Sequence, residues 1–74
     1  MKLEIRLFAY LREGRDKKVY LHIDENTTVK NVLDELKIPV EEASLILVNG
    51  QDGNLDTTFN EGDYLSVFPP VGGG

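Results

Sequence analysis

The segment TTVKNVLDELK, residues 27–37, decides the fold because it has the pattern of an amphipathic helix placed between two groups of strands. Its apolar residues recur at i, i+3, i+4 and i+7, which aligns them in one stripe along a helix. The stripe consists of Val29, Val32, Leu33 and Leu36. The hydroxyl of Thr27 or Thr28 can cap the first turn, and Pro39 ends the helix shortly after Lys37. We therefore expect one helix that buries its stripe against a sheet.

Two strands are predicted before this helix. Residues 2–9 alternate between apolar and charged side chains, which is the period of a half-buried strand. A polar break follows at residues 13–16, and the alternation resumes in a second strand around residues 19–23. The side chains expected to face the core are Leu3, Ile5 and Leu7 in the first strand and Val19, Leu21 and Ile23 in the second. The short polar connection indicates a hairpin.

Further strands are predicted after the helix. The run LILV, residues 45–48, is apolar throughout, and the following Asn49-Gly50 favours a strand that enters a turn. Residues 51–54 are interpreted as a loop and residues 55–59 as a weak strand. The run YLSVF, residues 64–68, is expected to form the last strand.

This order of elements predicts an α+β protein with the β-grasp, or ubiquitin-like, fold: a mixed sheet of four to five strands with one main helix. A chain of 74 residues is too short for two domains. We expect residues 1–68 to form the β-grasp domain and residues 69–74 to form a flexible C-terminal tail.

Composition and charge exclude several classes of function. The chain has no cysteine, so disulfides, thiolate nucleophiles and cysteine metal ligands are excluded, and any sulfur must be carried on something other than a side-chain thiol. A net charge of −5 argues against nucleic acid as a partner and favours a basic protein. The sequence shows neither a signal peptide nor an apolar run of membrane-spanning length, so we expect no membrane partner and a cytoplasmic location.

The run PPVGGG, residues 69–74, has little to bury, because only Val71 is a large apolar side chain outside the two prolines. Glycines without Cβ atoms can pass through a narrow channel, so the Gly74 carboxylate could enter the active site of a partner. Ordering such a segment costs about 1–2 kcal/mol per residue, which must be offset by contacts elsewhere on the domain. The alternative is an unselected, frayed chain end.

Phe8 and Phe68 share the outward parity of their strands. The first and last strands of a β-grasp sheet lie side by side and parallel, so the two rings are expected next to each other at the root of the tail. Exposed apolar patches of this kind often mark partner surfaces. The alternative is that twist or a bulge returns both rings to the core.

No catalytic or metal-binding constellation stands out in the sequence. His22 also has outward parity and has no second histidine or any cysteine nearby, so we assign it no role and predict no metal site. No nucleophile is paired with a base, and the chain is not expected to be catalytic alone.

Four short motifs resemble the MoaD/ThiS family of ubiquitin-like sulfur carriers over the whole chain. They are FAYLRE at residues 8–13, VNG at 48–50, GD at 62–63 and FPPVGGG at 68–74. The last is the most specific, and its double proline is closest to the small (sulfur carrier) subunit of molybdopterin synthase. A third glycine, Gly72, departs from the usual two of the family.

The resemblance implies a chemistry at Gly74. An ATP-dependent, ubiquitin-activating-type adenylyltransferase would join AMP to its carboxylate, and sulfur from a persulfide donor would replace the AMP. The resulting thiocarboxylate would donate sulfur to a pterin precursor of the molybdenum or tungsten cofactor in the large subunit of molybdopterin synthase, so that the chain is the small subunit of a sulfurtransferase. The chain itself would bind no cofactor, since the activating partner uses the ATP.

The resemblance also implies which residues serve the tail and the partners. Gly72 and Gly73 would be the part of the tail that passes through the channel of the partner. The partner-binding residues would be Phe8, Phe68, Pro69, Pro70 and Val71. Three alternatives stay open: a thiamine-type sulfur carrier, a ubiquitin-like protein modifier joined to lysines, and a docking module without covalent chemistry.

Overall fold

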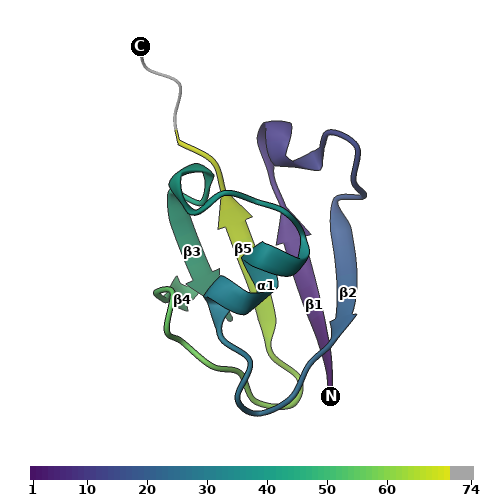
Figure 1. Ribbon diagram of the computed structural model, residues 1–74, viewed down its shortest axis with the longest axis vertical. Coiled ribbons are helices and arrows are strands. Elements are labelled where there is room, and N and C mark those ends of the chain that lie inside the picture. Colours follow the sequence, from purple (N-terminus) through teal and green to yellow (C-terminus); the bar gives the residue numbers. More distant parts are fainter. Residues whose placement is uncertain (71–74) are drawn as a thin grey trace.

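The computed structural model describes residues 1–70, which form a mixed sheet covered on one face by a helix (Figure 1). In chain order the elements are β1 (Lys2–Leu7), the 3-10 helix η1 (Ala9–Arg12), β2 (Lys18–His22), α1 (Val29–Glu35), the 3-10 helix η2 (Val40–Glu42), β3 (Leu45–Val48), β4 (Gln51–Asp52) and β5 (Tyr64–Phe68). Within residues 1–70 the five strands lie in the order β2-β1-β5-β3-β4, with β1 and β5 parallel and the other pairs antiparallel. The predicted β-grasp fold is confirmed.

The helix begins where the sequence places its cap. The Thr28 hydroxyl accepts a hydrogen bond from the Asn31 backbone N–H at 3.2 Å, and the Asn31 side chain accepts one from the Thr28 N–H at 2.9 Å. This reciprocal capping box satisfies two amides that the first turn leaves unpaired. The helix ends before Lys37, whose φ of 59° is left-handed, so α1 is shorter than the predicted range 27–37.

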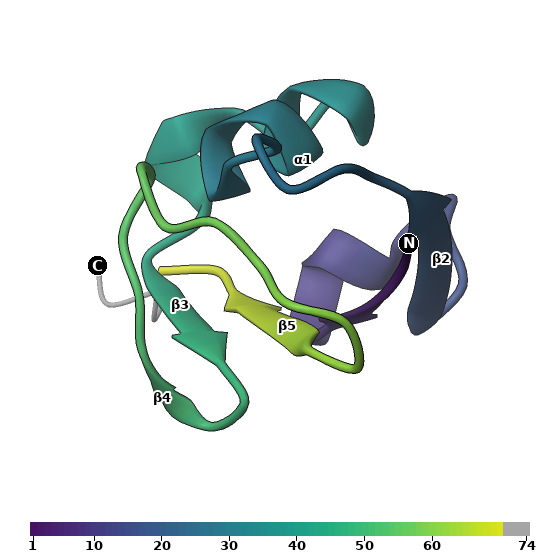
Figure 2. The same cartoon turned by 90° about the horizontal axis from the view of Figure 1, so that it is seen from below.

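The core lies between α1 and the two central strands, as Figure 2 shows for the helix above the sheet. The core side chains with at most 1% exposure on β1, β5 and α1 are Leu3, Ile5, Leu7, Leu65, Val67, Val29, Val32 and Leu33. The inward residues of β2, which include Val19 and Leu21, are only half-buried, because β2 is an edge strand. The alternation predicted for β1 and β2 is confirmed.

The prediction of a loop at 51–54 is wrong for Gln51–Asp52, which form β4, and the weak strand predicted at 55–59 is wrong. Asn49 and Gly50 both have positive φ, 53° and 82°, as in a type I′ turn, and they return the chain directly into β4 beside β3. Residues 55–59 instead serve the start of α1: the carbonyls of Thr57 and Leu55 accept hydrogen bonds from the Val29 and Lys30 amides at 3.0 and 3.1 Å. Besides one isolated bridge at Thr58, this described segment has no strand pairing.

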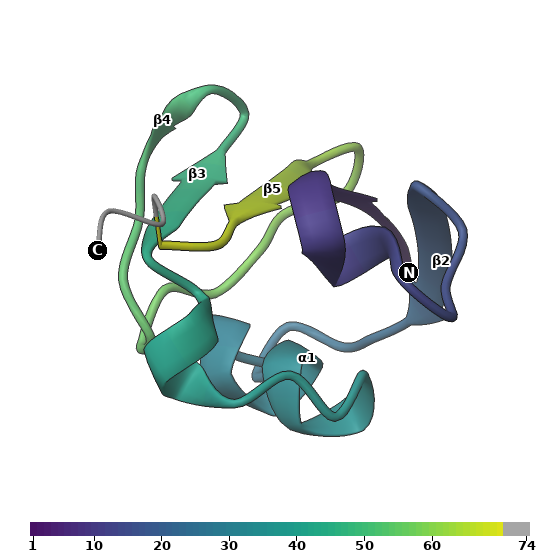
Figure 3. The ribbon, with the colours of Figure 1, turned by 90° about the horizontal axis from the view of Figure 1, so that it is seen from above.

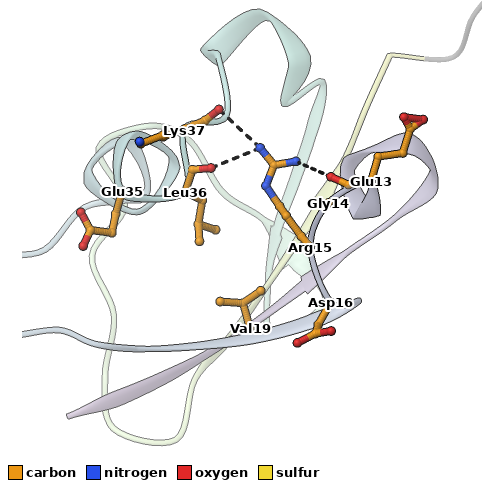
Figure 4. Close-up of a pocket in the computed structure, with 8 residues that line it drawn as sticks. All are labelled: Glu13, Gly14, Arg15, Asp16, Val19, Glu35, Leu36 and Lys37. Carbon is orange, nitrogen blue, oxygen red and sulfur yellow. Dashed lines mark hydrogen bonds between the residues drawn. The ribbon is translucent and has the colours of Figure 1, made fainter.

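The connection between β1 and β2 is tied to the end of the helix by Arg15 (Figure 4). Its guanidinium donates hydrogen bonds to the carbonyls of Leu36 at 3.2 Å and Lys37 at 3.5 Å, beyond the last turn of α1, and to the Leu11 carbonyl at 3.1 Å. A cation at a helix C-terminus also interacts favourably with the helix dipole. Arg15 therefore joins η1 to α1 across a separation of 21 residues.

No helix within residues 1–70 combines the length and apolarity needed to cross a bilayer.

Arg15→Met keeps the aliphatic stem and removes the donors, so the helix-end carbonyls lose their protein partner. We expect the free energy of unfolding to fall by about 1–2 kcal/mol and the Tm by about 4–16 °C. Lys30→Met is the matched control: it removes the same charge from a solvent-exposed pair with Asp34 at 3.1 Å and should cost less than about 0.5 kcal/mol. Equal losses in both variants, measured by thermal and urea unfolding, would show that Arg15 is not a structural tie.

Candidate functional site

Phe8 and Phe68 stack against each other at the end of the two central strands. The parallel register pairs Leu7 with Val67, so the next residue of each strand emerges at the same level and on the outward face. Their ring centroids lie 4.2 Å apart with an angle of 10° between the planes. Each ring is half-buried, because each covers one face of the other. The predicted pairing is confirmed, and neither ring returns to the core.

The backbone around the stack is held by short local bonds. Phe8 is extended, and Ala9, with a φ of 54°, turns the chain into η1, where the Leu11 amide donates to the Phe8 carbonyl at 3.2 Å. On the other side the Ser44 amide donates to the Phe68 carbonyl at 2.9 Å, just before β3 begins. Viewed from above, η1 lies beside the end of β5 (Figure 3). Both rings are therefore fixed to the sheet at their backbones.

An apolar hollow of about 530 Å³ surrounds the stack. We call it the aromatic hollow; its lining residues are Phe8, Ala9, Tyr10, Ser44, Leu45, Phe68, Pro69 and Pro70. Tyr10 and Leu45 are large side chains that remain 44% and 43% exposed. Desolvation raises the pKa of Tyr10, and the nearby Glu42 carboxylate raises it further. The surface is one that another protein can cover.

The aromatic hollow brings together four of the predicted site residues: Phe8, Phe68, Pro69 and Pro70. Pro69 is half-buried and Pro70 is exposed. The other predicted site residues, Val71, Gly72, Gly73 and Gly74, lie outside the described residues.

Sequence reasoning missed four of the eight residues that line the hollow: Ala9, Tyr10, Ser44 and Leu45, of which Tyr10 and Leu45 carry the large side chains. Leu45 lies opposite Phe68 in the β3–β5 register, but a run that is apolar at every position gives no periodicity from which to orient it. Tyr10 belongs to η1, a short turn that the alternation of β1 does not signal. Its position two residues after Phe8 was the available clue.

Outside the hollow, the outward face of the sheet carries paired cations and aromatic rings. The Arg6 guanidinium lies 3.9 Å from the centroid of the Tyr64 ring, and Lys2 Nζ lies 4.9 Å from that of Tyr20. Arg6 also donates a hydrogen bond to the Glu4 carboxylate, which lowers the pKa of Glu4. Among residues 1–70 no group of three or more His, Cys, Asp or Glu side chains is arranged to hold a metal ion.

The chain is similar to proteins of one known family. The model of the ThiS family matches residues 5–74. The chain is 34% identical over 92 aligned positions to small archaeal modifier protein 3 of Haloferax volcanii, with 100% of both chains covered. The crystal structure of SAMP1 from Haloferax volcanii superimposes with a TM-score of 0.81 at 30% identity over 100% of both chains.

A further similar structure is a chain in the protein–protein complex of subunits 1 and 2 of molybdopterin-converting factor from Helicobacter pylori 26695. It superimposes with a TM-score of 0.67 at 25% identity, and 100% of both chains is covered. The family match extends over nearly the whole chain, and the β-grasp architecture agrees with the similar structures. The chain belongs to the ThiS family, among the ubiquitin-like small modifiers and sulfur carriers of the ThiS/MoaD type.

Proposed function

We propose that this protein is a sulfur carrier whose Gly74 carboxylate is converted to a thiocarboxylate, and that it donates this sulfur in molybdopterin biosynthesis. The observation that carries the proposal is the aromatic hollow, in which Phe8 and Phe68 stack beside Pro69 and Pro70. These prolines lead directly into the glycine-rich segment. A partner that covers the hollow is thus held at the point from which the segment continues.

The proposed chemistry begins with activation by the adenylyltransferase. A carboxylate oxygen of Gly74 attacks the α-phosphorus of ATP, pyrophosphate leaves, and the acyl adenylate forms. The terminal sulfur of a donor persulfide then attacks the acyl carbon, and AMP leaves with its oxygen. A second thiol then attacks the sulfur of the donor cysteine, so that the S–S bond breaks, the thiocarboxylate leaves, and the donor cysteine remains in a disulfide with that thiol. The adenylyltransferase binds the ATP, so the carrier needs no cofactor of its own.

The energetics explain why a separate docking surface is needed. Holding four residues of glycine-rich chain in a narrow active site costs about 4–8 kcal/mol of conformational entropy. Buried aromatic anchors at interfaces often contribute about 2 kcal/mol or more each. The hollow offers three aromatic side chains, Phe8, Phe68 and Tyr10, together with Leu45. Covering them offsets the cost of ordering the segment.

The proposed partners are the adenylyltransferase, a persulfide sulfur donor and the large subunit of molybdopterin synthase. The similar Helicobacter pylori structure is a complex of two different subunits of molybdopterin-converting factor, which supports assembly with a large subunit. The double proline of the motif FPPVGGG also favours the molybdopterin recipient over the thiamine pathway.

A second candidate function is protein modification. It is favoured by the similarity to small archaeal modifier protein 3 and to SAMP1. The same activated Gly74 carbonyl would be attacked by a lysine amine, so that an amide bond forms and the activating group leaves. Both functions share the activation step and differ in the nucleophile that follows.

Phe68→Ala removes half of the stack, so we expect the Kd for the adenylyltransferase to rise by about tenfold or more, measured by isothermal titration calorimetry. Tyr20→Ala is the matched control, because Tyr20 is a 51% exposed aromatic of β2 outside the hollow, and its Kd should change less than about twofold. If Phe68→Ala and the unmodified protein are both folded and their Kd values are equal, the aromatic hollow is not part of the interface with the adenylyltransferase.

Deletion of Gly73 and Gly74 separates docking from chemistry. We expect the shortened protein to bind the adenylyltransferase within about threefold of the full chain and to incorporate no sulfur, because the acceptor carboxylate no longer reaches the active site. The readouts are calorimetry and transfer of radiolabelled sulfur. Loss of binding comparable to that of Phe68→Ala would contradict this division of roles.

Adducts formed in cells distinguish the two candidate functions. An N-terminally tagged chain should yield few adducts that resist both reducing agents and denaturation. Abundant adducts that vanish in the protein lacking Gly73 and Gly74 would favour the modifier function instead.

A further inference from the structure

Four of the eight Lys and Arg residues border a single hollow beside Phe8. We call it the basic hollow; its lining residues are Arg6, Leu7, Phe8, Arg12, Lys17 and Lys18. No acidic residue is among those that line it within residues 1–70. The rest of the chain has thirteen acidic and four basic side chains, which gives it a formal charge of −9. The four cations of the basic hollow carry a formal charge of +4. The molecule therefore carries a strong charge asymmetry despite its acidic net charge.

Within the described residues only one of the four cations forms an ion pair, although the pKa of Glu4, lowered mainly by its hydrogen bond from Arg6, is also lowered by the nearby charge of Lys18. Arg6 forms an ion pair with Glu4, whereas Arg12, Lys17 and Lys18 form no ion pair with any residue of the described part of the chain. The Arg12 Nε donates to the Leu7 carbonyl at 2.9 Å, and its guanidinium carbon lies 5.6 Å from the Phe8 ring centroid. Arg12 is thus held between the backbone and the stack.

The β1–β2 register brings several of these positive charges together. Arg6 and Lys18 are directly opposite each other in the antiparallel β1–β2 register. Like charges at opposed positions destabilise a sheet. The same pairing continues to Lys17, whose carbonyl accepts a hydrogen bond from the Leu7 amide at 2.8 Å. Glu4 offsets part of this repulsion through its ion pair with Arg6 and its attraction to Lys18, but Glu4 does not line the basic hollow.

We propose that the basic hollow binds a carboxylate-rich segment of the protein partner that covers the aromatic hollow. This inference rests on the proposed function and specifies the chemistry of its partner. Phe8 lines both hollows, so one partner surface with an apolar centre and an acidic margin reaches both. The charge asymmetry orients the chain before contact. The acidic margin of the partner attracts the basic hollow and repels the acidic rest of the chain.

Nucleic acid fits these observations less well than acidic protein side chains do. Three cations without an ion pair in the described part of the chain neutralise few phosphates, and a duplex that continues past the hollow meets a surface with a formal charge of −9. A short loop with two or three carboxylates matches the patch in both size and charge.

The test compares two double substitutions that change the net charge equally. Lys17→Glu with Lys18→Glu reverses the patch, and Lys30→Glu with Lys37→Glu reverses two exposed lysines on or just beyond α1. Association with the adenylyltransferase of the same organism is followed by stopped-flow fluorescence at low and high salt, after thermal unfolding has verified that each variant is folded. We expect the patch variant to associate about tenfold or more slowly at about 20 mM salt, with a smaller deficit at about 500 mM, and the α1 variant to change less than about threefold.

An equal slowing of both variants, or no slowing of either, would overturn the inference. So would binding of a fluorescent 20-base-pair duplex by the unmodified protein that the patch substitutions abolish, since that result assigns the hollow to nucleic acid. The Phe68→Ala variant distinguishes a failure of this inference from a failure of the proposed function. If it weakens binding while the patch variant matches the α1 variant, only this inference fails; if the unmodified protein does not bind the adenylyltransferase, the proposed function fails together with it.

Discussion

The parallel pairing of β1 with β5 in the middle of the sheet is the constraint on which the other features depend. It joins the two ends of the chain, and it buries Leu7 and Val67 against the helix while the following residues reach the outer face. The stack of Phe8 on Phe68 is a direct consequence of that register. A shift of the register by one residue would turn the core residues outward and separate the rings, so the core and the aromatic stack depend on the same set of hydrogen bonds.

The two hollows lie at or next to one end of the sheet. The N-terminus lies at the end of the sheet where β1 begins, and the opposite end is the one where β1 and β5 end (Figure 1). The residues that line the aromatic hollow and the basic hollow follow or adjoin this second end. Arg15 lies at this second end and ties η1 to the helix, which keeps the segment between Phe8 and Lys17 in place. A small domain can therefore hold a defined arrangement of surface side chains without a large core.

Much of the fold and half of the candidate site could be predicted from the sequence. Elements with a regular period, such as β1 and α1, follow from burial alone, and the Phe8–Phe68 pair follows from parity combined with topology. The remainder depends on contacts that have no local signal. Arg15 donates hydrogen bonds to carbonyls 21 and 22 residues away. Residues 55–59 are held by hydrogen bonds from the first amides of α1 to the carbonyls of Leu55 and Thr57. The two-residue strand β4 results from the positive φ of Asn49 and Gly50, a hairpin turn that the loop interpretation underestimated.

The central claim is that the Gly74 carboxylate is the group that carries sulfur. The most direct test is the intact mass of the protein purified from its own cells, or after incubation with ATP, the adenylyltransferase and a persulfide donor. Replacement of one oxygen by sulfur predicts a gain of about 16 Da that fragmentation localises to Gly74. An unchanged mass in the presence of an adenylyltransferase that forms the acyl adenylate would contradict the carrier function.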